Sequence, residues 1–273
     1  MPELPEVETV VRALNRKLTG RVVRGVRVLG KTRVPCGTGL SRKLCGLPVV
    51  AVRRRAKYIV IECAGGLGLL AHLGMTGSFR IEPMDVPRRR HDRIAVRLDG
   101  GDELRYEDAR RFGFVKAVVI PGDGSELAEL RGLGIEPLSR AFGAKMLQAR
   151  VGRRKTPVKT FIMDQGIVVG VGNIYASEAL FASGMDPRRP VDSVTPDEWG
   201  RLAREIKKVL RRALKNGGST IRDYRGVNGA EGAFQRKLKV YGRAGEACRV
   251  CGTAVASIRQ AGRSTFYCPT CQR

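Results

Sequence analysis

Apolar residues near the start of the chain recur at helical spacing. Leucine and valine side chains recur at helical spacing from Leu4 to Leu18, and Gly20 comes shortly after. This spacing puts the apolar side chains on one face of a helix, and glycine commonly stands just beyond a helix end. The pattern predicts an amphipathic helix that ends before Gly20.

Short runs typical of β-strands follow this helix. Ile94, Val96 and Leu98 alternate with other residues, as expected of a strand with one buried face. The turn-forming segment DGGD at residues 99–102 then leads into another run. The predicted strands are residues 22–29, 48–52, 58–63, 67–72, 94–98, 103–106 and 114–120. The first half of the chain is therefore predicted to be a β-sandwich with one leading helix.

The period becomes helical after a turn-rich break, PGDG at residues 121–124. Thr195, Pro196 and Glu198 signal the start of a long helix, because they supply an N-cap, a first-turn proline and a capping-box carboxylate. Its apolar stripe ends at Gly217. At residues 170–173, two glycines and an asparagine precede another helix, whose N-terminal N–H groups could hold a phosphate. A plain turn between helices explains that segment equally well.

The seven cysteines fall into two groups. The pattern C-x2-C-x16-C-x2-C is formed by Cys248, Cys251, Cys268 and Cys271. Two such knuckles can place four thiolates around one tetrahedral ion, so we expect one structural Zn²⁺ in a hairpin. Two disulfides are the alternative, which a cytosolic setting disfavours. The scattered thiols are predicted to be small buried residues: Cys36, Cys45 and Cys63.

Charge is the strongest compositional signal. The 273 residues include 51 Lys and Arg against 26 Asp and Glu, which gives a formal net charge of +25. Residues 201–273 alone hold 17 basic and four acidic side chains. An excess of this size favours a polyanionic partner such as nucleic acid over a charge that serves solubility alone. No apolar run approaches the ~20 residues that span a bilayer, and the start lacks a signal segment, so we expect a soluble, cytoplasmic protein.

Several motifs resemble one known family. In order along the chain they read MPELPEVET (1–9), RRAKY (54–58), HLGM (72–75), RRFG (110–113), GVGNIY (170–175), YGR (241–243) and the four cysteines. This set resembles the formamidopyrimidine-DNA glycosylases from end to end. The resemblance implies an α+β multidomain fold: a catalytic β-sandwich at residues 1–121, a helix-two-turn-helix domain at 122–238 and a zinc finger at 239–273.

The resemblance also implies catalytic residues. Once Met1 is removed, Pro2 presents a secondary amine, and an α-amino group titrates near ~8. In this family that amine attacks the sugar of the damaged nucleotide, and Glu3 protonates the ring oxygen. Glu6 is expected to support the site, Lys57 to assist elimination, and Arg263 to grip the flanking phosphates. Without the family match, Pro2 would only start a helix and Lys57 would belong to a solvated basic run.

Further positions match residues that handle the duplex. Because the damaged nucleotide has to leave the stack, something fills the gap. The matching residues are Met75, Arg110 and Phe112 as the wedge, and His91, Arg154, Lys155 and Asn173 as phosphate contacts. The segment with Ser219, Thr220 and Tyr224 resembles a loop that closes over the flipped base. The expected partner is double-stranded DNA with oxidised bases or abasic sites, bound by a monomer associated with the nucleoid.

Three functions are compatible with these residues. The first is a glycosylase and lyase directed at oxidised purines, such as 8-oxoguanine and formamidopyrimidines. The second is a glycosylase of the endonuclease-eight type for oxidised pyrimidines, which Leu4 disfavours because that branch often carries glycine there. The third is a non-catalytic zinc-ribbon DNA-binding protein, which gives no reason for Pro2 and Glu3 together with Lys57.

Overall fold

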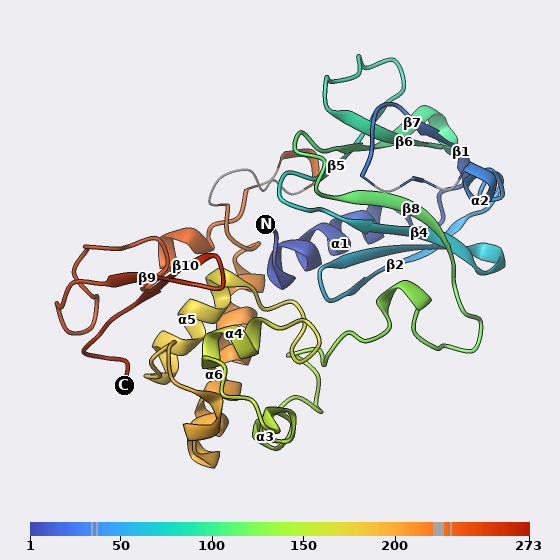
Figure 1. The fold of residues 1–273 in the computed structure, drawn as a ribbon. Helices are drawn as coiled ribbons and strands as arrows, with labels where there is room; N and C mark the ends of the chain where they lie inside the picture. The colour runs from blue at the N-terminus through green and yellow to red at the C-terminus, as the bar shows by residue number, and fades with distance from the viewer. Residues whose placement is uncertain (34, 37, 221–226, 230) are drawn as a thin grey trace. The chain divides into compact units, whose positions relative to one another are not determined.

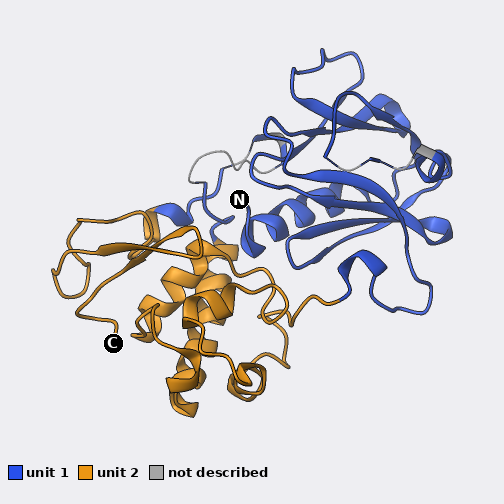
Figure 2. Cartoon of the chain, viewed as in Figure 1, with its two compact units in different colours: residues 1–131, 216–235 blue, residues 132–215, 236–273 orange. Residues whose placement is uncertain are grey.

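The chain divides into two compact units in the computed structural model (Figure 2). Unit 1 comprises residues 1–131 and 216–235, and unit 2 comprises residues 132–215 and 236–273. The structure describes residues 1–33, 35–36, 38–220, 227–229 and 231–273. The domain boundaries at residues 121 and 238 stay predictions.

Helix α1 (Leu4–Leu18) confirms the first predicted helix. Its apolar face is buried in the core of unit 1. Pro5 stands in the first turn, where a missing N–H breaks no intrahelical hydrogen bond. The last turn closes when Thr19 N donates to Asn15 O at 3.2 Å, and Gly20 leaves the helix with a φ of 85°.

Unit 1 is built around two antiparallel four-stranded sheets (Figure 1). Their orders are β1-β6-β7-β5 and β2-β3-β4-β8. The strands are β1 (Val23–Val28), β2 (Val49–Arg55), β3 (Tyr58–Cys63), β4 (Leu67–His72), β5 (Ser78–Pro83), β6 (Asp92–Leu98), β7 (Asp102–Glu107) and β8 (Phe114–Val119). Short helices are α2 (Thr38–Arg42) and the 3-10 turns η1 (Ala64–Gly66), η2 (Asp99–Gly101), η3 (Ala128–Leu130) and η5 (Val227–Gly229).

Within each sheet, the strand register places core residues side by side in a row. One row across the first sheet consists of Val26, Val96, Leu104 and Ile81. The matching row across the second sheet consists of Val52, Ile61, Leu69 and Ala117. All of these residues belong to or pack against one apolar cluster, so the predicted sandwich is confirmed.

Unit 2 is helical, with a small hairpin at the C-terminus. Its helices are α3 (Ala144–Val151), α4 (Val158–Met163), α5 (Asn173–Ser183), α6 (Pro196–Lys215) and the 3-10 turn η4 (Val191–Ser193). The 3-10 turn η6 (Phe234–Lys237) begins in unit 1 and ends in unit 2. Trp199 of α6 is buried and packs on Phe161 of α4, with ring centroids 5.5 Å apart. Glu198 Oε2 accepts a hydrogen bond from Thr195 N at 2.9 Å, which confirms the predicted capping box.

The hairpin of β9 (Ala256–Gln260) and β10 (Arg263–Tyr267) docks on the helices of unit 2. The buried carboxylate of Glu178 in α5 accepts three backbone N–H groups at 2.8–2.9 Å from Lys239, Val240 and Tyr241. Gln272 Nε2 donates to Met185 O at 2.8 Å. The C-terminal segment is therefore tied to the helical part of unit 2 on both sides of the hairpin.

The three scattered cysteines differ in exposure. Cys36 and Cys63 are buried as predicted, but the prediction for Cys45 is wrong. Cys45 lies just after α2 and is exposed, with its Sγ 3.3 Å from Arg24 O. Within the described residues, every helix is too short or too polar to cross a membrane.

Candidate functional site

Two glutamates organise the first turn of α1. Glu3 is the N-cap and Glu6 stands three residues later, so their side chains and backbone N–H groups form a reciprocal capping box. Glu6 Oε2 accepts the N–H of Glu3 at 2.9 Å. Pro2, Glu3 and Glu6 are all buried. The helix thereby fixes Glu3 directly beside the residue that would carry the nucleophilic amine.

The second carboxylate oxygen of Glu6 reaches the distant segment of unit 1. Glu6 Oε1 accepts the N–H of Ser219 at 2.6 Å. Gly218 has a φ of +81°, and a Cβ on it would lie 2.6 Å from Glu6 Oε1. Only glycine can occupy this position without displacing the carboxylate. Thr220 N donates to Gln235 Oε1 at 3.1 Å, whereas Tyr224 lies outside the described residues.

Lys57 occupies a tight turn between β2 and β3. Arg55 pairs with Tyr58 across the two strands, which leaves Ala56 and Lys57 as the loop. Ala56 has a φ of 55°, a strained value for a residue with a Cβ. Lys57 is only 6% exposed, so it does not belong to the solvated face suggested by its basic neighbours.

An aromatic cluster lies beside Lys57. The His72 ring is 5.0 Å from the Tyr58 ring and 6.2 Å from the Phe114 ring, measured between centroids. Burial, together with the positive charges of Lys57 and Arg33, lowers the pKa of His72 to about 4. His72 Nδ1 accepts the N–H of Gly74 at 3.1 Å, which assigns the remaining proton of the neutral ring to Nε2.

The three aromatic side chains Tyr58, His72 and Phe114 line a cavity of about 580 Å³ in unit 1. Its other lining residues are Met1, Arg33, Gly74, Met75 and Phe112. The cavity is large enough to admit a nucleobase-sized group, and its wall is mainly aromatic and apolar. The N-terminus and two of the three predicted wedge residues therefore share one cavity.

The remaining predicted wedge residue, Arg110, lies with Phe112 in the loop after β7. Phe112 is 45% exposed, and the Arg110 guanidinium lies 4.8 Å from its ring centroid. The buried Asp108 fixes this loop, because its carboxylate accepts Gly113 N at 2.8 Å and Thr76 Oγ1 at 2.5 Å. Phe112 is thus held outside the core, contrary to the ordinary role of a phenylalanine.

His91 lies just before β6, in the first sheet of unit 1. It is half-buried, and its Nδ1 is 3.4 Å from Arg93 Nη2. Its carbonyl accepts the N–H of Asp108 at 3.0 Å. This hydrogen bond therefore joins His91 to the loop that carries Arg110 and Phe112.

Unit 2 carries a buried lysine that sequence reasoning missed. Lys159 is 2% exposed, and its Nζ donates to Asn173 Oδ1 at 2.6 Å and to Thr265 Oγ1 at 2.7 Å. Asn173 Nδ2 in turn donates to Ser264 O at 2.9 Å. The first residue of α5 is therefore joined to the hairpin one residue from Arg263. The sequence signal was a cation within a mainly apolar segment, residues 158–163.

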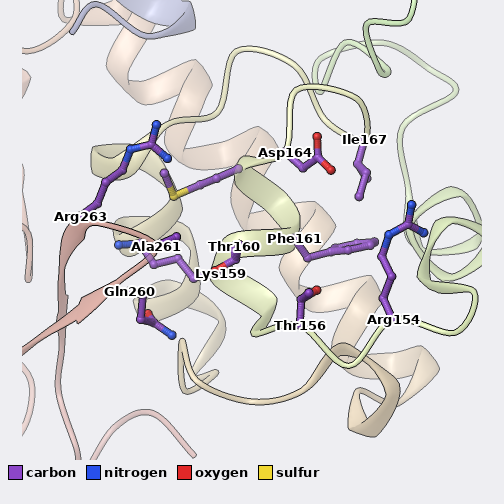
Figure 3. Close-up of a pocket in the computed structure, with 11 residues that line it drawn as sticks. Arg154, Thr156, Lys159, Thr160, Phe161, Asp164, Ile167, Gln260, Ala261 and Arg263 are labelled. Atoms are coloured by element: carbon purple, nitrogen blue, oxygen red, sulfur yellow. The ribbon is translucent and has the colours of Figure 1, made fainter.

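Arg154 and Arg263 line a second cavity of about 260 Å³, which belongs wholly to unit 2. Figure 3 shows the two guanidinium groups at opposite ends of it, with Lys159 and Thr160 between them. Arg154 Nη1 also donates to Arg150 O at 2.6 Å, at the end of α3. Lys155 is exposed beside Arg154. Cationic groups thus face solvent on one side of this unit.

The four C-terminal cysteines converge on one point. Their sulfur atoms all lie within 4.8 Å of one another. Among the described residues, these four are the cluster of potential metal ligands close enough together to hold one ion. The Sγ atoms of Cys248 and Cys271 are 3.9 Å apart, and those of Cys251 and Cys268 are 3.5 Å apart. Zinc–sulfur bonds of ~2.3 Å in a tetrahedron require sulfur separations of about 3.8 Å. The site fits a zinc ion.

Hydrogen bonds around the sulfurs support the same conclusion. Val250 N donates to Cys248 Sγ and Cys271 N donates to Cys268 Sγ, each at 3.5 Å. Such bonds orient thiolate ligands.

Family models match most of the chain. The formamidopyrimidine-DNA glycosylase N-terminal domain matches residues 1–115, the H2TH domain of the same glycosylases matches residues 133–225, and a zinc finger found in FPG and IleRS matches residues 245–273. The formamidopyrimidine-DNA glycosylase of Laribacter hongkongensis is 49% identical over 100% of both chains. The chain belongs to the formamidopyrimidine-DNA glycosylase family. The resemblance stated from the motifs is confirmed.

Solved structures of this family agree with the fold. The MutM (Fpg) protein of Thermus thermophilus is 42% identical and superposes with a TM-score of 0.86, covering 99% of this chain and 98% of that one. A Lactococcus lactis FPG mutant in complex with Fapy-dG-containing DNA is 30% identical over 100% of both chains, with a TM-score of 0.90. The predicted α+β fold with helix-two-turn-helix and zinc-finger parts is therefore confirmed.

Proposed function

We propose that this family member excises oxidised purines from duplex DNA and then cuts the strand at the resulting abasic site. The base-excision glycosylase function itself follows from its family and full-length relatives. The position of the N-terminus supports the proposed covalent reaction most directly. The buried Pro2 and Glu3 start α1 next to Met1, which lines a cavity shared with the aromatic cluster beside Lys57.

The proposed reaction begins at the nitrogen of Pro2, after removal of Met1. The amine lone pair attacks the anomeric carbon, and the glycosidic bond breaks so that the base leaves with the bonding electrons and gains a proton. Glu3 gives a proton to the ring oxygen as the ring opens, and the amine loses its own proton. The product is a cationic iminium between Pro2 and the sugar.

The iminium then makes strand cutting possible. It acidifies the neighbouring C–H bond, so loss of that proton expels the 3′ phosphate, and a second elimination expels the 5′ phosphate. Lys57, at the strained turn, is the proposed proton carrier for elimination. Arg263 is assigned to the phosphates that flank the lesion, together with Arg154 and Lys155.

Access to the lesion requires the nucleotide to leave the duplex. Met75, Arg110 and Phe112 are proposed to fill the gap, because an exposed aromatic ring with a guanidinium stacked on it can replace a lost base. His91 and Asn173 are proposed backbone contacts. The complex is proposed to contain one copy of the chain.

Borohydride trapping tests the covalent step. The mature chain should cross-link to duplexes that contain 8-oxoguanine, and Pro2→Gly should lose most strand cutting because it changes the attacking amine. Glu3→Gln should bind damaged DNA without excising the base. Full nicking by a chain that mass spectrometry shows to retain Met1 would contradict the role of Pro2, and preferential trapping on oxidised pyrimidines would contradict the purine assignment.

We also propose that the four cysteines hold one structural Zn²⁺. A hairpin this small has little core of its own, so metal binding supplies its folding free energy. Elemental analysis should find one zinc per chain, and Cys248→Ser or Cys268→Ser should abolish tight DNA binding while the melting of unit 1 persists. Wild-type DNA affinity after verified zinc removal would refute the proposal.

A further inference from the structure

A segment of unit 1 carries three consecutive arginines on its surface. It connects β5 to β6 and comprises residues 83–92, which we name the arginine strap. Every residue from 83 to 90 is exposed, including Arg88, Arg89 and Arg90. Long loops are usually held by their own apolar side chains, yet Met84 is 47% exposed and Val86 is 37% exposed. Something else must therefore order the strap.

A buried arginine of β7 provides that order. Arg105 has a relative exposure of 0%. Its two Nη atoms donate to the carbonyls of Pro83, Met84 and Pro87 at 3.3–3.4 Å. Its Nε donates to the equally buried Glu103 at 3.1 Å. One guanidinium thus fixes three backbone carbonyls of the strap from beneath.

The far end of the strap is held by a second buried arginine. Arg80 of β5 is 5% exposed, and its Nη2 donates to Asp92 Oδ1 at 2.8 Å. Asp92 Oδ2 accepts the N–H of Arg89 at 3.0 Å, and Asp92 N donates to Arg89 O at 3.1 Å. The turn that carries Arg89 and Arg90 is closed by this pair of hydrogen bonds. Both bonds are made within the chain itself, without a ligand.

The arginines of the strap differ in their partners. Arg89 lies 3.2 Å from Glu82 and 3.8 Å from Glu107, so much of its charge is compensated. Within the described part of the chain, no carboxylate lies within ion-pair distance of Arg88 or Arg90. Two uncompensated guanidinium groups therefore flank a compensated one on a preordered turn.

We propose that the arginine strap is a phosphate-binding surface for the backbone of duplex DNA, with Arg88 and Arg90 as its contacts and Arg105 as a positioning residue. Buried ion clusters seldom add net stability over apolar packing, so the cost of burying Arg105 and Glu103 requires another benefit. Preordering a cationic loop lowers the entropy lost when it binds. The proposal depends on the proposed function only in taking DNA as the ligand.

The first experiment compares two double variants. Arg88→Gln/Arg90→Gln removes the strap charges, and Arg42→Gln/Lys43→Gln removes two exposed charges near α2 of the same unit, with the same change in net charge. Affinity for an undamaged duplex is measured against salt concentration. The strap variant should flatten the slope of log affinity against log salt by about two, since each lost phosphate contact contributes about 0.9. The control should change the slope by much less.

Equal slopes for the two double variants would overturn the proposal and leave the strap as an ordinary solvated surface. Wild-type binding to undamaged DNA needs no excision, so this outcome is distinct from failure of the proposed catalytic function. That failure would appear as absent trapping by a chain that still binds duplex DNA with its full salt dependence.

A second experiment tests the positioning role of Arg105. Arg105→Lys keeps the charge next to Glu103 but removes the fork that reaches three carbonyls. In that background, Arg88→Gln/Arg90→Gln should cost less affinity than in the wild type, because the strap is no longer preordered. An equal loss in both backgrounds would exclude positioning by Arg105. If Arg105→Lys fails to fold, the comparison with the Arg42 and Lys43 variant still decides the phosphate-binding proposal.

Discussion

At the scale of single residues, the surroundings of His72 oppose its protonation. Burial is the largest cause of its lowered pKa, and Lys57 and Arg33 add positive charge nearby. A histidine whose pKa is lower in the folded chain than in the unfolded chain binds fewer protons when folded. Its contribution to stability is therefore complete above the unfolded pKa of ~6.5 and is lost as the pH falls toward 4.

We predict that His72→Asn reduces this acid sensitivity. Asparagine can still accept the N–H of Gly74 but does not titrate. Between pH 7 and pH 5 the wild type should lose about 2 kcal/mol more unfolding free energy than the variant, given a folded pKa of about 4. Urea titrations at the two pH values measure the difference. Identical losses would show that His72 protonates as easily in the folded chain as in the unfolded chain.

Sequence patterns identified residue types better than residue environments. Lys57 stands in a run of arginines, and no pattern in that run indicates that its side chain is buried. Asp108, Lys159 and Glu178 escaped notice because each acts through backbone groups or side chains that its own sequence neighbourhood does not reveal. The four cysteines were identified because their ligand spacing is local and repeated. Long-range hydrogen bonds leave no such periodic signal.

At the scale of elements, Lys159 joins two helices to the hairpin. It lies in α4, and its Nζ reaches the first residue of α5 and two residues of β10. Because these acceptors are within or beside the docked hairpin, one ammonium group connects three elements at a single point. Asn173 and Arg263 are positioned by the same connection.

We predict that Lys159→Met destabilises unit 2 by about 1–3 kcal/mol, since Asn173 Oδ1 and the buried Thr265 Oγ1 lose their donor. Affinity for duplex DNA should fall as well. The control is Lys208→Met, which removes an exposed charge from α6 and should change stability by less than ~0.5 kcal/mol. Urea unfolding of both variants is the measurement. Equal unfolding midpoints would mean that the Lys159 hydrogen bonds contribute no net stability.

The predicted elements match the structure most closely where one side of an element is buried. The boundaries of β3 and β4 agree with the sequence to the residue, because both strands consist mainly of apolar residues. Strand β5 was missed because Ser78–Pro83 contains two charged residues and ends in proline. Its charged residues, Arg80 and Glu82, take part in the ion pairs beneath the arginine strap. The spacing of apolar residues in the sequence does not predict such an environment.

At the scale of the whole molecule, two groups of predicted DNA contacts should behave differently. Arg154, Lys155 and Arg263 are proposed to neutralise backbone phosphates, which carry no information on damage. Loss of any one should weaken damaged and undamaged duplex alike and flatten the salt slope by about one unit. Arg110→Ala or Phe112→Ala should instead impair excision of a paired lesion far more than binding to undamaged DNA.

The measurement uses excision rates and affinities on three duplexes: a paired lesion, an abasic site and undamaged DNA. An abasic site is already unstacked and needs less assistance, so the wedge variants should cut it with a smaller deficit. If Phe112→Ala lowered all three activities equally, Phe112 would have no role in nucleotide flipping.

The chain returns to unit 1 after completing the helices of unit 2. Residues 216–235 belong to unit 1, where Val227 joins the core and Ser219 supplies an N–H to Glu6. During synthesis, residues 1–131 emerge from the ribosome long before that segment exists. The hydrogen bond between Ser219 N and Glu6 Oε1 can form only after residue 219 has been translated. The hydrogen bond that joins the start of α1 to the second segment of unit 1 is therefore formed late, when most of the protein has already been made.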